Sequence, residues 1–171
     1  MLSSAAIMPA PASLEPPASA RAVEHALAAY AGEPGALMPV LHAIQDALGY
    51  VPPDALPRVA LALNLSRAEV HGVVTFYHDF RTSPPGRRIV KICRAEACQS
   101  MGAEALVAHA EASLGVALGA TRGDGWVTLE PVYCLGNCAC SPAVLIDGEL
   151  HGRVTPARLD ELTRSAGVAR R

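Results

Sequence analysis

The sequence is poor in aromatic residues and has no excess of charge of either sign. One Trp, four Tyr and two Phe make up 4% of its 171 residues, and 14 basic against 16 acidic side chains leave a formal net charge of -2. A nearly neutral chain has no electrostatic basis for binding nucleic acid or an anionic membrane surface. We therefore expect neither as a partner.

Long uncharged stretches are missing as well. The longest, residues 131–146, contains two prolines and is shorter than the roughly 20 apolar residues that a membrane-spanning helix needs. The first 20 residues have no basic segment ahead of their apolar part, and Pro9 and Pro11 interrupt that part, which is not the pattern of a secretory signal. The sequence thus predicts no membrane span and a reducing, cytoplasmic location.

Apolar residues are nevertheless abundant, at 51% of the chain, and they follow helical spacing in the first half. Proline, alanine and serine dominate residues 1–20, which are predicted to be a disordered lead-in. Helical patterns then occupy residues 22–30, 34–48 and 54–63, and a fourth begins at Ser66. Ser66 and Glu69 have the spacing of a capping box. Residues 21–82 are therefore predicted to form a small helical bundle.

The pattern changes after a turn-rich segment at residues 83–86. Strands are predicted at 89–93, 126–133, 143–146 and 149–154, helices at 103–114 and 155–162, and a loop at 119–125. Val127, Leu129 and Tyr133 fall on one side of the second strand, with Thr128 on the other. Residues 87–168 are predicted to form an α/β domain with a four-stranded mixed sheet.

Four of the five cysteines form two close pairs. Cys93 and Cys98 are separated by four residues, Cys134 and Cys138 by three, and 35 residues lie between the pairs. Each pair begins directly after a predicted strand, so two loops at the same end of a sheet would bring four thiolates together. Four sulfur ligands suit either zinc or the two irons of a [2Fe–2S] cluster.

The spacing within the pairs favours iron–sulfur over zinc, because many zinc sites use pairs two residues apart, although zinc tolerates gaps of two to four. Gly136 would let backbone amides approach the sulfurs, and Arg94 places a positive charge beside Cys93. Two disulfides, or a zinc-stabilised interaction module, are the alternatives. A thioredoxin-type dithiol oxidoreductase is disfavoured, because the chain has no Cys-x-x-Cys. Cys140 is predicted to be a bystander.

The remaining polar residues do not suggest catalysis by this chain. We find no paired carboxylates, no Ser, His and Asp set and no phosphate-binding glycine loop in the sequence, so no substrate site is predicted. His71 and His78 stand near Phe76 and Tyr77. This segment is either an ordinary packed one or a docking surface.

Several of these segments together resemble the thioredoxin-like [2Fe–2S] ferredoxin subunits that accompany flavoprotein subunits in NAD-linked complexes. The resemblance rests on Cys93 and Cys98, on Cys134-Leu135-Gly136-Asn137-Cys138 with Pro142 after it, and on Gly72-Val73-Val74-Thr75-Phe76-Tyr77. It covers residues 23–162, nearly the whole chain outside the lead-in.

The resemblance implies a thioredoxin-like fold for residues 87–168 and one [2Fe–2S] cluster. Its ligands would be Cys93, Cys98, Cys134 and Cys138, whereas Cys140 is not a ligand in the family pattern. It also implies that the chain transfers electrons without a catalytic residue of its own, and that the helical bundle packs on a flavin-bearing subunit.

Residues 71–81, 93–99 and 132–142 look most like the gamma subunit of an NAD-dependent molybdenum formate dehydrogenase. That likeness implies FMN and NAD on a beta subunit and a molybdenum cofactor on an alpha subunit, where formate is oxidised while NAD is reduced. The alternatives are the corresponding subunit of NADH:quinone oxidoreductase, which is respiratory complex I, and that of an NAD-linked hydrogenase.

Overall fold

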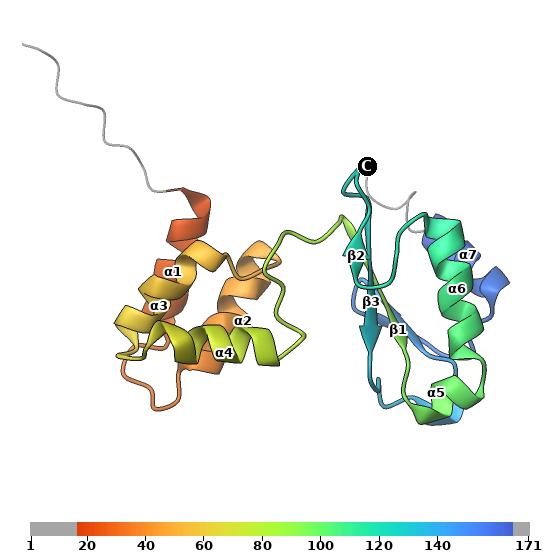
Figure 1. Cartoon of the computed structure of the whole chain (residues 1–171), viewed down its shortest axis with the longest axis horizontal. Coiled ribbons are helices and arrows are strands. Elements are labelled where there is room, and N and C mark those ends of the chain that lie inside the picture. The colour runs from red at the N-terminus through yellow and green to blue at the C-terminus, as the bar shows by residue number, and fades with distance from the viewer. Residues whose placement is uncertain (1–16, 166–171) are drawn as a thin grey trace, which may run out of the picture. The chain divides into compact units, whose positions relative to one another are not determined.

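The structure is a computed structural model that describes residues 17–165. The chain divides into two compact units, residues 1–83 and 84–171, and each is described by itself (Figure 1). Most of the predicted lead-in lies outside the described residues, but its last part does not, because the first helix already begins at Ala18. None of the helices in the described range has the length and apolar character needed to cross a bilayer.

The first unit is helical, as the sequence predicts. It contains α1 (Ala18–Ala29), α2 (Leu37–Leu48), the 3-10 turn η1 (Pro53–Ala55), α3 (Leu56–Ala62) and α4 (Arg67–Phe76). Helix α2 begins later than predicted, because Gly35 has a φ of +72°, outside the right-handed helical region. The helix predicted at 54–63 is divided into η1 and α3.

Apolar side chains from all four helices form the core of this unit. Val40, Leu41, Ile44, Val59 and Val70 are completely buried there. The predicted capping box at the start of α4 is present: the Ser66 amide donates to Glu69 Oε2 at 2.8 Å, and the Glu69 amide donates to Ser66 Oγ at 3.2 Å.

A buried glutamine in α2 holds the segment that follows α4. The Gln45 side-chain amide donates to the carbonyl of Asp79 at 2.8 Å, and its oxygen accepts from the Arg81 amide at 2.8 Å. The chain therefore stays attached to the helical unit as far as Arg81.

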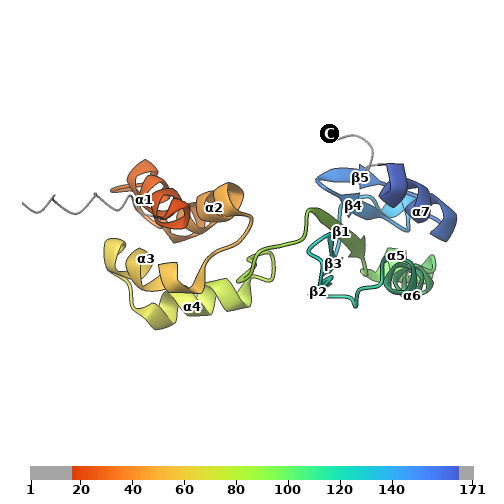
Figure 2. The same ribbon diagram turned by 90° about the horizontal axis from the view of Figure 1, so that it is seen from above.

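The second unit is a sheet with helices on one face (Figures 1 and 2). Its elements are β1 (Arg88–Cys93), α5 (Glu96–Ser100), α6 (Ala103–Leu114), β2 (Ala120–Thr121), β3 (Val127–Val132), η2 (Cys138–Cys140), β4 (Val144–Ile146), β5 (Glu149–His151) and α7 (Pro156–Ser165). The strand order is β2-β3-β1-β4-β5. Strands β1 and β3 are parallel and the other neighbours antiparallel, so the sheet is mixed, as predicted.

The number of strands is five, where the sequence predicts four. The additional strand, β2, is a two-residue edge strand inside the predicted loop at 119–125. Helix α5 is also absent from the prediction. Both elements are too short for a periodic pattern to indicate them.

Alternate residues of the sheet face the helices and form the core. Val90 and Ile92 of β1, with Val127 and Leu129 of β3, pack against α6 and α7. The alternation predicted for β3 fails at its end: Tyr133 is 70% exposed, because the strand stops at Val132.

Thr128 is buried rather than outward-facing. Its hydroxyl oxygen accepts from the Gly86 amide at 2.6 Å and lies 2.8 Å from the Thr121 hydroxyl of the additional strand β2. A Cβ at Gly86 would lie 2.7 Å from the Val127 backbone, so this approach requires glycine.

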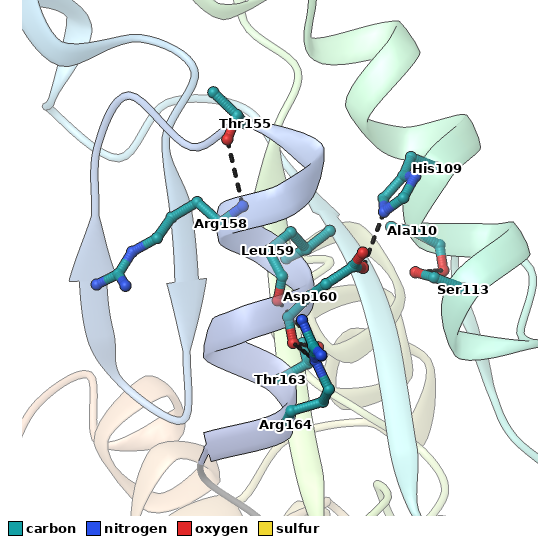
Figure 3. Close-up of polar contacts among 9 residues, drawn as sticks. All are labelled: His109, Ala110, Ser113, Thr155, Arg158, Leu159, Asp160, Thr163 and Arg164. Carbon is teal, nitrogen blue, oxygen red and sulfur yellow. Dashed lines mark hydrogen bonds and ion pairs between the residues drawn. The ribbon is translucent and has the colours of Figure 1, made fainter.

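The two long helices of this unit are also joined by a polar contact (Figure 3). His109 Nε2 of α6 lies 2.8 Å from Asp160 Oδ1 of α7. The Thr155 hydroxyl caps α7 by accepting from the Arg158 amide at 3.2 Å, which confirms the predicted start of this helix.

Candidate metal centre

Both cysteine pairs lie at the end of the sheet where β1 and β3 terminate. Cys93 is the last residue of β1, and it is in register with Val132, the last residue of the parallel neighbour β3. Cys134 follows two residues later. Helix α5, which carries Cys98, lies beyond the same end of the sheet (Figure 1). The topology therefore brings the predicted loops together.

The first pair is held inside the protein. Cys93 is 3% exposed and Cys98 is 2% exposed. They pack with Ala103 at the start of α6 and with Ala143 just before β4, and these small side chains allow the surrounding elements to approach the sulfurs closely. The position of this pair is thus fixed by side-chain packing.

The second pair is exposed and is held by the conformation of its backbone. Cys134 has a φ of 101° and Gly136 a φ of 73°, in the left-handed half of the map that non-glycine residues rarely enter. In this conformation the Gly136 amide donates to Cys134 Sγ at 3.4 Å. Such turns direct successive N–H groups to one side, which favours a negatively charged sulfur.

The two segments contact each other at Cys93. Burial raises the pKa of the Cys93 thiol, but hydrogen bonds from the amides of Ala95, Cys134 and Leu135 and the interaction with the Cys98 side chain lower it, and the net result is a pKa below the ordinary value. The amides thus favour the thiolate, the form that binds metal.

The Cys138 thiol of the exposed pair has a pKa above the ordinary value instead. The hydrogen bond and the charge of Cys134 raise the pKa of the Cys138 thiol, and the nearby Cys98 and Cys93 raise it further. Neighbouring thiolates repel one another unless cations separate them. The other three thiols therefore all lie close enough to Cys138 to affect it, and none of the four is in a disulfide.

Two further residues support the exposed segment. A Cβ at Gly152 would lie 2.7 Å from Asn137 Nδ2 and 2.7 Å from the Cβ of Cys140. The Arg153 amide donates to the Cys140 carbonyl at 2.6 Å. Cys140 is thus packed against the turn after β5, and its bystander role stays a prediction.

The positive charge expected beside Cys93 is paired. The Arg94 guanidinium donates to both carboxylate oxygens of Glu104, at 2.9 Å each. Sequence reasoning also overlooked Ser141, whose buried hydroxyl contacts both segments. Nothing in the sequence around Ser141, which stands between Cys140 and Pro142, indicates that its hydroxyl contacts both cysteine segments.

The donor set fits an iron–sulfur cluster. Within residues 17–165 no three His, Cys, Asp or Glu side chains are grouped so as to hold one metal ion, but a [2Fe–2S] cluster requires only two cysteines for each iron. Two cysteine pairs, with amide N–H groups directed at Cys93 and Cys134, provide sulfur ligands and the hydrogen bonds that such sulfurs accept.

The chain belongs to the thioredoxin-like [2Fe–2S] ferredoxin family, whose sequence model matches residues 23–166. The resemblance to this family found in the sequence is thereby confirmed. A subunit of the NADH-quinone oxidoreductase of Pseudomonas aeruginosa is 38% identical over 134 residues, which cover 78% of this chain and 81% of that subunit.

Hydrogenases supply further similar proteins. The NADP-reducing hydrogenase subunit HndA of Solidesulfovibrio fructosivorans is 32% identical over 75% of each chain. Among solved structures, an NAD+-reducing [NiFe]-hydrogenase in the air-oxidised state matches with a TM-score of 0.63 and 27% identity. That match covers 75% of this chain but only 23% of the hydrogenase chain.

Proposed function

We propose that this chain is the electron-transfer subunit of an NADH-linked oxidoreductase complex. It would hold one [2Fe–2S] cluster through Cys93, Cys98, Cys134 and Cys138, next to a flavin- and NAD-binding subunit. The observation that carries the proposal is the contact of Cys93 with the amides of Cys134 and Leu135, which unites the two pairs. When bound, such a cluster accepts and returns one electron at a time.

The residues of this chain have distinct parts in that task. Burial of Cys93 and Cys98 keeps water from one side of the site, and the Gly136 amide stabilises negative charge on Cys134. Cys134 and Cys138 are exposed, so the site can be approached closely by a partner from their side.

The comparisons favour some host complexes over others. The similar proteins described above belong to NADH-quinone oxidoreductase and to hydrogenases, and they support these hosts better than the formate dehydrogenase suggested by residues 71–81, 93–99 and 132–142. We therefore place the chain in a complex of the NADH-quinone oxidoreductase or NAD(P)-linked hydrogenase type. A cytoplasmic location agrees with the use of free cysteines.

An apolar groove on the helical unit supports docking to a partner subunit. It has a volume of about 490 Å³ and is lined by Leu37, Leu65, Glu69, Gly72, Val73, Phe76 and Tyr77. The Phe76 side chain is 73% exposed, and its ring lies edge-on to Tyr77 with centroids 5.1 Å apart. Exposed aromatic side chains of this kind are typical anchors of protein interfaces. We propose that the flavin-bearing subunit covers this groove.

Spectroscopy of the purified chain tests the cofactor. After anaerobic purification we expect iron and inorganic sulfide in equal amounts, visible absorption of a [2Fe–2S] cluster, and an EPR signal after one-electron reduction. A colourless protein with one bound zinc would contradict the proposal.

Isolation of the native complex tests the host and the groove. Subunits pulled down with the tagged chain should include a flavin- and NAD-binding protein, and a molybdenum-containing subunit would instead indicate formate dehydrogenase. Phe76→Ser should weaken recovery of the flavin-bearing subunit. Leu61→Ser is the matched control, because Leu61 is equally exposed on α3 but does not line the groove.

A further inference from the structure

Ser141 connects the two cysteine pairs through one hydroxyl group. The residue is 8% exposed. The Cys98 thiol donates to Ser141 Oγ at 3.5 Å, and the Ser141 hydroxyl donates to the Cys138 carbonyl at 2.8 Å. The hydroxyl therefore contacts one cysteine of the buried pair and one of the exposed pair.

These hydrogen bonds must change when the cysteines bind metal. A metal-bound cysteine has lost its thiol proton, so Cys98 then accepts hydrogen bonds and no longer donates. The hydroxyl proton of Ser141 is free to rotate toward the sulfur, and a hydrogen bond to a charged acceptor is stronger than one to a neutral carbonyl.

The surroundings of the two acceptors favour the same change. Cys138 is an exposed residue, so its segment is in contact with water, which can bond a carbonyl that has lost its donor. Cys98 is almost completely buried and has no comparable access to water. A hydrogen bond from the Ser141 hydroxyl therefore stabilises the Cys98 sulfur more than it stabilises the Cys138 carbonyl.

We propose that Ser141 is a positioning residue that donates a hydrogen bond to the Cys98 sulfur and thereby raises the reduction potential of the cluster. Hydrogen bonds to ligand sulfurs raise the potential because they stabilise the additional negative charge of the reduced state. This inference rests on the ligand set of the proposed function.

The test is a potentiometric titration of the anaerobically purified full chain, followed by the EPR signal of the reduced cluster. Ser141→Ala should lower the midpoint potential and so shift the redox equilibrium at least threefold, about 30 mV for one electron. Ser141→Thr keeps the hydroxyl and should stay near the wild-type potential. Ser141→Val has the shape of the threonine variant but no hydroxyl, so its potential should resemble that of the alanine variant. Ser100→Ala is the control, because its exposed hydroxyl on α5 donates only to the Ala97 carbonyl.

The outcomes separate this inference from the proposed function. A wild-type potential in the alanine variant, or equal potentials in the threonine and valine variants, would overturn the role of Ser141. Loss of the cluster from both the alanine and the valine variant would mean that Ser141 is needed for cluster assembly. That outcome would also overturn its proposed effect on the reduction potential. Absence of a [2Fe–2S] signal from the wild-type chain would contradict the proposed function itself.

Discussion

The two cysteine pairs are held in place by different physical means. Cys93 and Cys98 are buried at a strand end and on a short helix, among small side chains. Cys134 and Cys138 are exposed, and the left-handed backbone at Cys134 and Gly136 determines their direction. One pair therefore depends on side-chain volume, and the other on backbone conformation.

This difference determines how each pair responds to mutation. A change of volume near the buried pair disturbs the core, so stability and cluster binding should change together. A change near the exposed pair acts on a loop, which loses stability only where the loop itself is closely packed, as it is at Gly152. Four sets of substitutions, described from the largest expected effect to the smallest, examine this distinction.

Substitution of a proposed ligand in the exposed segment should have the largest effect. We expect Cys134→Ser to lose most of its bound iron, because one iron of the cluster would lack a thiolate. Cys140→Ser should keep the cluster, since Cys140 packs against Gly152. Iron and sulfide analysis of both variants provides the measurement. Equal losses would show that the ligand assignment in this segment is wrong.

An added methyl group at Gly152 tests the support of the exposed segment. Gly152→Ala places a Cβ within 2.9 Å of the Cys140 carbonyl oxygen, so the segment must shift. We expect a loss of about 1–3 kcal/mol in the free energy of unfolding, measured with urea, together with reduced cluster content. Gly123→Ala is the control, because among the described residues no atom beyond its two chain neighbours lies within 4 Å of its added Cβ. Similar losses in both variants would contradict close packing at Gly152.

The corresponding test of the buried pair is Ala103→Val. Ala103 is fully buried beside Cys93 and Cys98, so the larger side chain should cost about 1–2 kcal/mol of unfolding free energy and reduce cluster content in parallel. Ala105→Val places the same β-branched residue on the exposed side of α6 and controls for helix propensity. If stability falls while the cluster is fully retained, packing does not position this pair.

The smallest effect is expected at Arg94. Its charge is paired with Glu104, so Arg94→Ala should lower the midpoint potential only slightly and Glu104→Gln should raise it slightly. The double variant should return to the wild-type potential, and the single shifts should diminish in high salt. A shift larger than that of Ser141→Ala would mean that the arginine, not the hydroxyl, dominates the electrostatics near the buried pair.

The sequence predicts those features that have a regular pattern. Helix α6 has the predicted bounds, residues 103–114, because its apolar spacing and Gly115 mark it clearly. The juxtaposition of the cysteine loops follows from two neighbouring strands, because β1 ends at Cys93 and β3 ends two residues before Cys134. The capping box at Ser66 and Glu69 is equally local, so it too is visible in the sequence.

Features that depend on tertiary contact were not predictable. Strand β2 exists only because β3 pairs with it, and Tyr133 is exposed because β3 ends one residue earlier than its pattern suggests. The pairing of Arg94 with Glu104 joins residues that flank α5, a helix too short to leave a periodic signal. The contact of Ser141 with Cys98 spans 43 positions in the chain.

The attachment of Arg81 to Gln45 limits how far the two units can separate. Gly86 is already bonded to Thr128 of the sheet, so only residues 82–85, two of them proline, connect the anchored positions. The five Cα–Cα steps from Arg81 to Gly86 span at most about 18 Å when the chain is fully extended. Once the helical unit has bound a partner, the cysteine-bearing unit is therefore retained at a high effective concentration, about millimolar for a short tether, beside the same partner.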